Sequence, residues 1–573
     1  MTDIRWTGHP FVDAGLAALL AGADMERLEE VTPDSLRRAV DALCRVLLSD
    51  QALGIGVERS FVKGALSQVF PNSELVNPSN WKGGAEGVRS KFSSAIAEDL
   101  ARAICCLENS GEEVCSICGQ RRPDEAFVLV RKDKVPLLEG IVNFYPGLRY
   151  GLRICGICAL AVRFLPMSIL RTGRSKRLWF FHTYSLSIAL DTAREYGWDH
   201  FDRAIAANHF LDFRASWQTA GEAATALYVL CELLCQHADH LRSAYEHPLP
   251  TTAYLFSNDN RGGYVEAITI PNELLRFLAL LFQESPSAYD RFWRELLVVP
   301  AELTDSEQRA RARFVSNVAR RLVEAEPIAN FCLDDETPYL RGGWVGHRRY
   351  LQEVRRMSVA KLAVIERLGL EIAQSPASRK YITELRRASR GQLYPALLRL
   401  VRESFLSHEE FYRLVPPHDS GSAAEVRDLI LAVAYEWEHC QQRNEDFPRI
   451  SLEHVTTPAP DETLHRIQEI GSRLVSELPN LGRWIAQLQT ARSSDRIRAT
   501  YLAGVQRGAL RFEDFLFLAP FQDQRRLWLL RDYLLAFLFD RARPQLPAET
   551  ETLPIEEALE EQQIEDEPGA AIY

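Results

Sequence analysis

The residues of this sequence best suited to chemistry are four cysteines in two Cys-x-x-Cys pairs, Cys115 with Cys118 and Cys155 with Cys158. Each pair offers two thiolates from one short turn of backbone. Four thiolates fill the tetrahedral coordination shell of Zn²⁺ and leave no open position, which is typical of a structural site. The 36 residues between the pairs exceed the ~15–20 of a compact zinc ribbon, so we expect a β-hairpin looped out between them. The spacing predicts a structural zinc centre.

Other interpretations of the cysteines stay open but are weaker. Either pair can instead be two buried thiols, and a redox Cys-x-x-Cys would need a βαβ context that the neighbouring sequence lacks. A second metal site could be drawn from Cys231, Cys235, His237 and His240. However, Cys231 and Cys235 continue a helical apolar stripe, so we expect them to pack in a core.

Catalytic motifs are missing from the sequence. The glycine-rich stretch 83–89 lacks the Gly-Lys-Ser/Thr ending of a phosphate-binding loop. There is no Gly-x-Ser-x-Gly nucleophile elbow, and Asp334, Asp335 and Glu336 resemble a solvated loop more than a two-metal centre. We therefore expect a protein that binds partners and is not an enzyme.

The elements that must position the cysteines are mostly helices. Helical apolar spacing occurs in the run that Asp34 is expected to cap, in the stripe at 464–478, and at 527–539, which is apolar on nearly all sides. β-type runs occur between the cysteine pairs, at 126–130 and 141–144. The patterns predict a mostly α, multidomain fold with a small α+β zinc-binding insert and a C-terminal helical bundle.

Five segments follow from these patterns. They are an N-terminal helical region with an irregular loop (1–110), a basic zinc-binding insert with four cysteines (111–178), a central mainly helical region (179–359), the C-terminal helical bundle (360–545) and an acidic tail that we expect to be disordered (546–573).

Length and composition indicate a globular protein of several domains. The chain has 573 residues, several times the roughly 150 of an average domain, and is 46% apolar and 25% charged. No apolar run approaches the ~20 residues of a membrane-spanning helix, and residues 1–6 do not resemble a secretory signal. We expect a cytoplasmic protein without membrane contact, whose 11 cysteines are thiols or metal ligands and not disulfides.

The net charge of −11 conceals an uneven distribution. Nine of the acids lie at 549–567, where there is no Lys or Arg, so the other residues together carry only −2. By contrast, 121–177 holds twelve Lys or Arg against four acids. Such a local excess of cations is typical of a polyanion-binding surface, although a solvated face of an ordinary domain gives the same pattern.

Candidate DNA-binding residues lie in the Asn-rich loop, in the basic insert and in a basic stripe of the C-terminal bundle. They are Asn72, Asn77, Asn80, Trp81 and Lys82; Arg121, Arg122, Lys132, Lys134, Arg174, Lys176 and Arg177; and Arg386, Arg387 and Arg390. Asn and Lys can hydrogen-bond base edges or phosphates, and an exposed Trp can stack on a base. Alternatively, the Asn side chains cap helices and Trp81 belongs to a core.

The opening residues 6–19, Trp-Thr-Gly-His-Pro-Phe-Val-Asp-Ala-Gly-Leu-Ala-Ala-Leu, are followed after a helical stretch by the two cysteine pairs. This combination resembles the large subunit of type I-B CRISPR Cascade complexes, the Cst branch of the Cas-eight family. The resemblance is strongest over 6–180, and beyond that it is a likeness of architecture only. Asn is commoner in the family at the position of His9.

The resemblance implies a non-catalytic subunit of an RNA-guided ribonucleoprotein complex for antiviral defence. Such a subunit would recognise the target-adjacent motif (PAM) on duplex DNA, help to open the duplex and stabilise the R-loop with its displaced strand, while guide pairing reads the sequence. The implied partners are the crRNA-guided Cascade backbone and handle-binding subunits, and a helicase-nuclease or a transposition adaptor. In the family a small subunit can arise by internal initiation, for which Met357 is the candidate start here.

A second hypothesis belongs to a different class. A zinc-stabilised helical scaffold or regulatory protein that binds protein partners would show the same cysteine pairs and helical patterns. The two hypotheses differ in whether the Asn-rich loop and the basic stripes contact nucleic acid.

Overall fold

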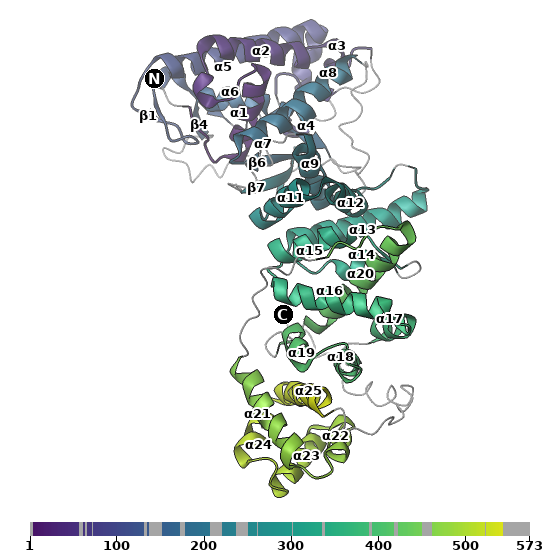
Figure 1. Ribbon diagram of the computed structural model, residues 1–573. Coiled ribbons are helices and arrows are strands. Elements are labelled where there is room, and N and C mark those ends of the chain that lie inside the picture. The colour runs from purple at the N-terminus through teal and green to yellow at the C-terminus, as the bar shows by residue number, and fades with distance from the viewer. Residues whose placement is uncertain are drawn as a thin grey trace. The chain divides into compact units, whose positions relative to one another are not determined.

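The computed structural model describes residues 4–56, 61–62, 66–71, 73–130, 135–136, 152–171, 178–206, 220–236, 250–259, 262–300, 302–334, 338–388, 392–416, 422–449, 461–521 and 523–542. The chain divides into two compact units, Met1–Met357 and Ser358–Tyr573, which we describe separately. Both are built mainly of helices, and the strands form small antiparallel sheets (Figure 1). The predicted fold class is confirmed.

All strands of the described residues lie in the first unit. Its helices are α1 (Pro10–Gly22), α2 (Pro33–Leu47), α3 (Asp50–Leu53), α4 (Ser67–Val69), α5 (Gly84–Glu108), α6 (Gly156–Phe164), α7 (Leu186–Ala193), α8 (Asp199–Ala206), α9 (Glu222–Gln236), α11 (Asn272–Glu284), α12 (Pro286–Leu297), α13 (Asp305–Val323), α14 (Ala329–Cys332) and α15 (Gly343–Glu353). Its strands are β1 (Glu113–Val114), β2 (Arg121–Arg122), β3 (Phe127–Val130), β4 (Leu152–Cys155), β5 (Leu170–Arg171), β6 (Leu178–Thr183), β7 (Thr251–Asp259), β8 (Gly262–Ile270), β9 (Leu333–Asp334) and β10 (Tyr339–Leu340).

The helix predicted after Asp34 is present as α2, but Asp34 does not cap it. The cap is Thr32, whose side chain accepts a hydrogen bond from the backbone N–H of Ser35, while the Ser35 side chain accepts from the backbone N–H of Thr32. This reciprocal capping box satisfies two backbone donors at once. Asp34 lies in the first turn, where a negative charge is favoured by the helix dipole.

The core of the first unit is organised around α6, whose nine residues are all buried. Helix α1 crosses it so closely that a Cβ on Gly15 would lie 2.0 Å from the backbone oxygen of Ala161. Helix α5 lies against its start, where a Cβ on Gly156 would lie 2.3 Å from the backbone carbon of Arg102. Both contacts need glycine because any side chain would separate the helices. The segments predicted as 1–110 and 111–178 thus share one hydrophobic core.

The opening residues 6–19 fold around a buried carboxylate. Asp13 in α1, which is fully buried, accepts hydrogen bonds from the backbone N–H groups of Thr7 (2.8 Å) and Gly8 (2.9 Å) and lies 2.9 Å from Nε2 of His182 in β6. The indole N–H of Trp6 donates to the backbone oxygen of Thr183 (3.0 Å). Gly8 has a φ of +77°, which glycine adopts without strain. The spacing of this motif therefore serves to join the chain start to β6.

The four-stranded antiparallel sheet β5-β6-β7-β8 was not predicted, because the segment 179–359 was expected to be mainly helical. Strands β7 and β8 pair along their full length, from Thr251 with Ile270 to Asp259 with Gly262. Their β-branched and aromatic residues and the turn before Gly262 were the signals that could have predicted a hairpin. Phe11 of α1 packs between β6 and β7, with its ring 5.2 Å from that of Phe180 and 5.1 Å from that of Phe256.

The second unit is entirely helical among its described residues. Its helices are α16 (Val359–Gln374), α17 (Ser378–Arg387), α18 (Leu393–Arg402), α19 (His408–Leu414), α20 (Ser422–Arg443), α21 (Glu462–Glu477), α22 (Leu481–Gln489), α23 (Ser494–Gln506), α24 (Phe512–Leu518) and α25 (Gln524–Arg541). The predicted stripe at 464–478 is α21, which Asp461 caps. The predicted buried helix is α25, which packs against α18, α19, α21 and α22 (Figure 1). In the described part of the chain no helix has the length and apolar character needed to cross a bilayer.

The close approach of α1 to α6 leads to a first prediction. Gly15→Ala will lower the free energy of unfolding of the first unit by about 2 kcal/mol, because the added methyl group forces the two backbones apart. Scanning calorimetry of the full chain will measure the change in the melting transition. Gly83→Ala is the matched control, since nothing lies within 4 Å of a Cβ at that position. Equal stability of the two variants would contradict the packing described here.

Candidate metal centre and basic surfaces

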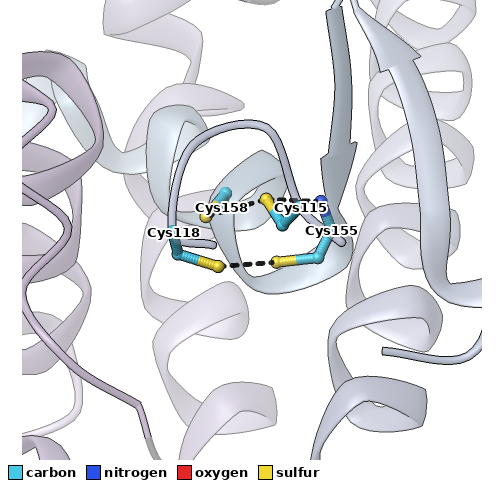
Figure 2. Close-up of side chains that lie close together, drawn as sticks. All are labelled: Cys115, Cys118, Cys155 and Cys158. Atoms are coloured by element: carbon cyan, nitrogen blue, oxygen red, sulfur yellow. Dashed lines mark hydrogen bonds between the residues drawn. The ribbon is translucent and has the colours of Figure 1, made fainter. Parts of the chain in front are cut away.

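The four predicted cysteines meet at one point, with all of their Sγ atoms within 4.8 Å of one another (Figure 2). Sγ of Cys115 lies 3.9 Å from Sγ of Cys158, and Sγ of Cys118 lies 3.8 Å from Sγ of Cys155. These distances are too long for disulfides. They match the edge of about 3.8 Å expected for a sulfur tetrahedron around a metal ion with bonds of ~2.3 Å. The arrangement can hold one metal ion.

The first pair is shaped by a turn that follows β1. The backbone N–H of Gly119 donates to the backbone oxygen of Cys115 (3.0 Å), and Cys115 donates in turn to the oxygen of Gln120 (3.0 Å). Gly119 has a φ of +66°, so the residue after the pair must be one that tolerates the left-handed region. The turn directs both thiols of the pair toward the same side, and β2 then returns antiparallel to β1.

The second pair lies at the junction of β4 and α6. Strand β4 pairs antiparallel with β3, from Cys155 opposite Phe127 to Leu152 opposite Val130. The partner of β3 is therefore 152–155, and the predicted β-type run at 141–144 lies outside the described residues. Cys155 is the N-cap of α6, and Cys158 lies in its first turn. The positive end of a helix dipole favours negative charge there. The dipole of α6 thus favours negative charge at this junction, whereas hydrogen bonding among the thiols raises the pKa of Cys155 and of Cys158 as long as no cation is bound.

Burial leaves the centre accessible from one direction at most. Cys115, Cys155 and Cys158 are each at most 1% exposed, whereas Cys118 is partly exposed. A fifth thiol, that of Cys106 in α5, forms a hydrogen bond with Cys155. Cys106 lies outside the two predicted pairs, and nothing in its local sequence indicated that it would approach the cluster. Four thiols with so little exposure are typical of structural metal centres.

The four thiols share their protons because they lie so close together. Hydrogen bonds from the other three cysteines lower the pKa of Cys115. The same interactions raise the pKa of Cys118 and of Cys158, and hydrogen bonds with Cys106 and Cys115 raise the pKa of Cys155 to about 12. The cluster without a cation therefore carries about one negative charge at neutral pH, and a dication has to displace the remaining protons.

The predicted basic residues of the insert have different surroundings. Arg122 is only 3% exposed and lines a small cavity together with Cys118, Cys155 and Cys158, so it faces the cysteines and not solvent. A buried cation there offsets the negative charge of the thiolates. This position argues against the predicted role of Arg122 in DNA contact. Arg121 is exposed and pairs with Glu112 (2.5 Å).

The Asn-rich loop is a 3-10 helix, η3 (Pro78–Gly83), whose polar groups bond mainly within the protein. The Asn77 side chain accepts a hydrogen bond from the backbone N–H of Ser79 (3.0 Å), and Asn80 donates to the backbone oxygen of Glu74 (2.8 Å). For Trp81 both an exposed position and a place in the core were open, and the structure favours the second. Trp81 is half-buried against the core and donates its indole N–H to the backbone oxygen of Leu75 (2.9 Å). Lys82 remains exposed.

A buried ion network attaches this loop to α6. The guanidinium of Arg163 in α6 forms two hydrogen bonds with the carboxylate of Glu74 (2.7 and 3.1 Å) and one with Asp99 of α5 (3.0 Å). Burial alone would lower the pKa of Arg163, but the two carboxylates raise it above its ordinary value. Loss of one partner would leave a buried charge uncompensated, which typically costs ~3–5 kcal/mol. The position of Lys82 is thus fixed by the helix that carries Cys158.

Part of the basic stripe predicted for the second unit lies exposed on α17. Arg386 and Arg387 are exposed, as are Arg379 and Lys380 seven residues earlier, so all four lie on one side of the helix. Arg399 of α18, which also belonged to the sequence pattern, instead bonds Glu384 and Glu403 (2.8 Å each). The other predicted positions, Asn72, Lys132, Lys134, Arg174, Lys176, Arg177 and Arg390, lie outside the described residues.

The sulfur cluster predicts the metal content of the protein. Purified chain will carry about one metal ion, and Cys115→Ser will lose it because three sulfurs hold a dication much more weakly than four. Elemental analysis will count the ion, and hydrogen exchange will show loss of protection at the start of α6 while α21–α25 are unchanged. Cys235→Ser is the matched control, since Cys235 is a thiol outside the cluster and, unlike Cys231, is exposed and not packed in a core as expected. Metal-free wild-type protein would refute the centre.

The pKa directions predict how metal affinity depends on pH. Three of the four thiols have raised pKa values, so binding of one ion will release about three protons at neutral pH. Affinity will therefore fall as the pH is lowered, because protons compete with the cation for sulfur. Calorimetric titration of demetallated protein in buffers of different ionisation enthalpy will count the protons. Release of no protons would contradict the proposed sharing.

Comparisons with known proteins give no name to this arrangement. No family model, no curated protein and no solved structure matches the chain.

Proposed function

We propose that this chain is the non-catalytic large subunit of an RNA-guided CRISPR type I-B effector complex. In this role it recognises the target-adjacent motif on duplex DNA, helps to open the duplex and stabilises the R-loop, and then supports recruitment of a downstream nuclease or of transposition machinery. The backbone and handle-binding subunits of the complex hold the guide RNA, and the chain itself breaks no bonds.

The observation that carries this proposal is that the two features behind the resemblance, residues 6–19 and the cysteine pairs, pack against each other. Residues 6–19 contain Gly15, whose backbone lies against Ala161, three residues beyond Cys158 in α6. The opening motif and the cysteine centre therefore belong to one packed core, which supports the view that they occur together for a structural reason. If the opening motif and the cysteine cluster were unrelated, the helix that carries the motif would not need to pack against the helix that carries Cys158.

We propose that the bound metal is Zn²⁺ in a structural role. Zn²⁺ has no preferred coordination geometry of its own, and it accepts four thiolates in a closed tetrahedron. Redox iron can also take four thiolates, but nothing in the proposed function transfers electrons. The ion would hold the β1–β2 turn against the start of α6 and so support the loop that carries Lys82.

Two surfaces are proposed to meet DNA. One is the surface of Lys82 in the first unit, whereas Arg121, which is exposed and pairs with Glu112, is a separate candidate for phosphate contact. The other is the cationic side of α17, with Arg379, Lys380, Arg386 and Arg387, which suits the backbone of the displaced strand. Asn77, Asn80 and Trp81 would act by shaping η3, since their polar groups already have partners within the protein.

The boundary between the two units supports a further part of the proposal. The second unit begins at Ser358, directly after Met357, and the Ser358 side chain caps α16 by accepting a hydrogen bond from the backbone N–H of Lys361 (3.2 Å). A polypeptide initiated at Met357 would thus contain a whole compact unit with a capped first helix. We propose that such a product would serve as a small subunit of the complex.

The two surfaces can be tested separately in the guide-loaded complex. Lys82→Glu will weaken binding roughly tenfold to duplexes that carry the preferred flanking bases. Arg386→Glu with Arg387→Glu will weaken retention of the opened duplex by a similar factor. In both cases the new carboxylates repel the phosphates of the DNA. Gel-shift on duplexes that differ only in the flanking bases will measure both. Lys91→Glu and Arg45→Glu, at exposed positions on α5 and α2, are the matched controls.

The same experiment separates this proposal from its alternative. A zinc-stabilised scaffold that binds only proteins would give unchanged DNA binding in every variant, and the internal hydrogen bonds of η3 are what that alternative would lead one to expect. Cleavage of the target by the isolated chain would contradict both hypotheses.

A further inference from the structure

An exposed apolar surface on the second unit has no part in the proposed function. Phe512 is 61% exposed, Phe521 66%, Leu516 45% and Leu502 43%. These four side chains come from α23, from α24 and from the segment that joins α24 to α25, and we call them the Phe512 patch. Large apolar side chains exposed as a group mark a site of interaction.

The patch is held in place by packing beneath it. Phe515, which is buried, lies between its two aromatic members, with ring centroids 6.0 Å from Phe512 and 6.2 Å from Phe521. The guanidinium of Arg498 lies 5.8 Å from the ring centroid of Phe521. Rings supported in this way lose little conformational freedom on binding, which favours association.

The stretch of chain that carries the patch has an excess of exposed cations. The exposed arginines of 492–526 are Arg492, Arg496, Arg507, Arg511, Arg525 and Arg526, whereas the exposed acids of the same stretch are Asp495, Glu513 and Asp523. A fourth acid, Asp514, is buried and bonds Arg466 and Arg473 (2.9 and 2.6 Å). The partner of this surface should therefore be both apolar and acidic.

We infer that the Phe512 patch binds the acidic C-terminal segment of this same chain, residues 549–567. That segment has nine acids, no Lys or Arg, and four large aliphatic residues, Leu553, Ile555, Leu559 and Ile564. The acids complement the arginines and the aliphatic residues complement the exposed rings. No other stretch of the sequence combines such a charge with apolar residues.

The length of the chain permits this contact. Helix α25 ends at Arg541, and its 18 residues span about 27 Å. The twelve residues from Ala542 to Leu553 are joined by eleven steps and reach about 36 Å when extended, which is enough to return along α25 to its start, where Phe521, Arg525 and Arg526 lie. Because the segment is tethered, its effective concentration at the patch is in the millimolar range.

This contact would regulate the binding of polyanions to the Phe512 patch, a role that goes beyond the proposed function. Arginines occupied by the carboxylates of residues 549–567 are not available to phosphate groups, so the segment would reduce binding of this surface to polyanions in general. Single-stranded nucleic acid and a second copy of the chain are the competing occupants, and the experiment below distinguishes them.

The test uses the full chain and a protease that cleaves after glutamate. Phe512→Ser with Phe521→Ser will increase the rate of cleavage within 549–567 by on the order of tenfold, because the docked segment is protected and the free one is not. Intact mass measured over time gives the rate. Val265→Ser, at a 52% exposed site in the first unit, is the matched control. Arg525→Glu with Arg526→Glu will give the same increase and serves if the Phe variant does not fold.

A reciprocal measurement makes the result specific. Replacing Leu553, Ile555, Leu559 and Ile564 by Ser will raise hydrogen exchange over 512–526 in the full chain. Rapid cleavage of the wild-type segment, equal to that of the patch variants, would overturn the inference. If an added dT20 oligonucleotide protects 512–526 from hydrogen exchange and the substitutions in 549–567 have no effect, the patch binds nucleic acid and the inference is wrong. If the protection instead depends on protein concentration, the patch binds a second copy of the chain and the inference is likewise wrong.

Discussion

The burial of α6 on all sides is the constraint on which the first unit depends. A helix of nine residues with no solvent-exposed face must be packed by other elements at every turn, and here two of the contacts are made through glycines, at Gly15 and Gly156. Each glycine permits backbone to approach backbone, so α1 and α5 are fixed relative to α6 with little tolerance. A displacement of α6 would be transmitted to both helices and to everything that they position.

The cysteine centre and the buried ion network lie at opposite ends of this helix. Cys155 and Cys158 belong to its start, and Arg163 near its end bonds Glu74 and Asp99. Each site has its own partners, since thiolates and a guanidinium are costly to bury without them. Together they tie the β1–β2 turn and η3 to the same core. A metal ion would thus influence the Lys82 surface without lying near it, through the position of α6.

The sequence predicted well what depends on local chemistry and poorly what depends on tertiary contacts. The spacing of the cysteines predicted the cluster, and the apolar stripes predicted α21 and α25, because these features follow from short-range periodicity. The fate of Arg122 and Trp81 could not be predicted in this way, since their burial results from elements far away in the chain. The β6-β7-β8 sheet was missed for the same reason: β6 and β7 are about 70 residues apart, and their runs of apolar residues also fit helices.

The distribution of arginines then suggests where function can reside. Arginines that bond buried carboxylates, such as Arg163 and Arg473, are committed to the fold and cannot be exchanged for contacts with a partner without a large loss of stability. The exposed cations of α17 and of the Phe512 patch carry a smaller cost, because interactions of exposed charges contribute little to stability and can be exchanged for a phosphate or a foreign carboxylate. Composition alone does not separate these two groups, since both appear in the sequence as basic stripes. Burial separates them, and it confines any polyanion contact to a few surfaces on a chain that is otherwise close to neutral, which limits non-specific binding to nucleic acid.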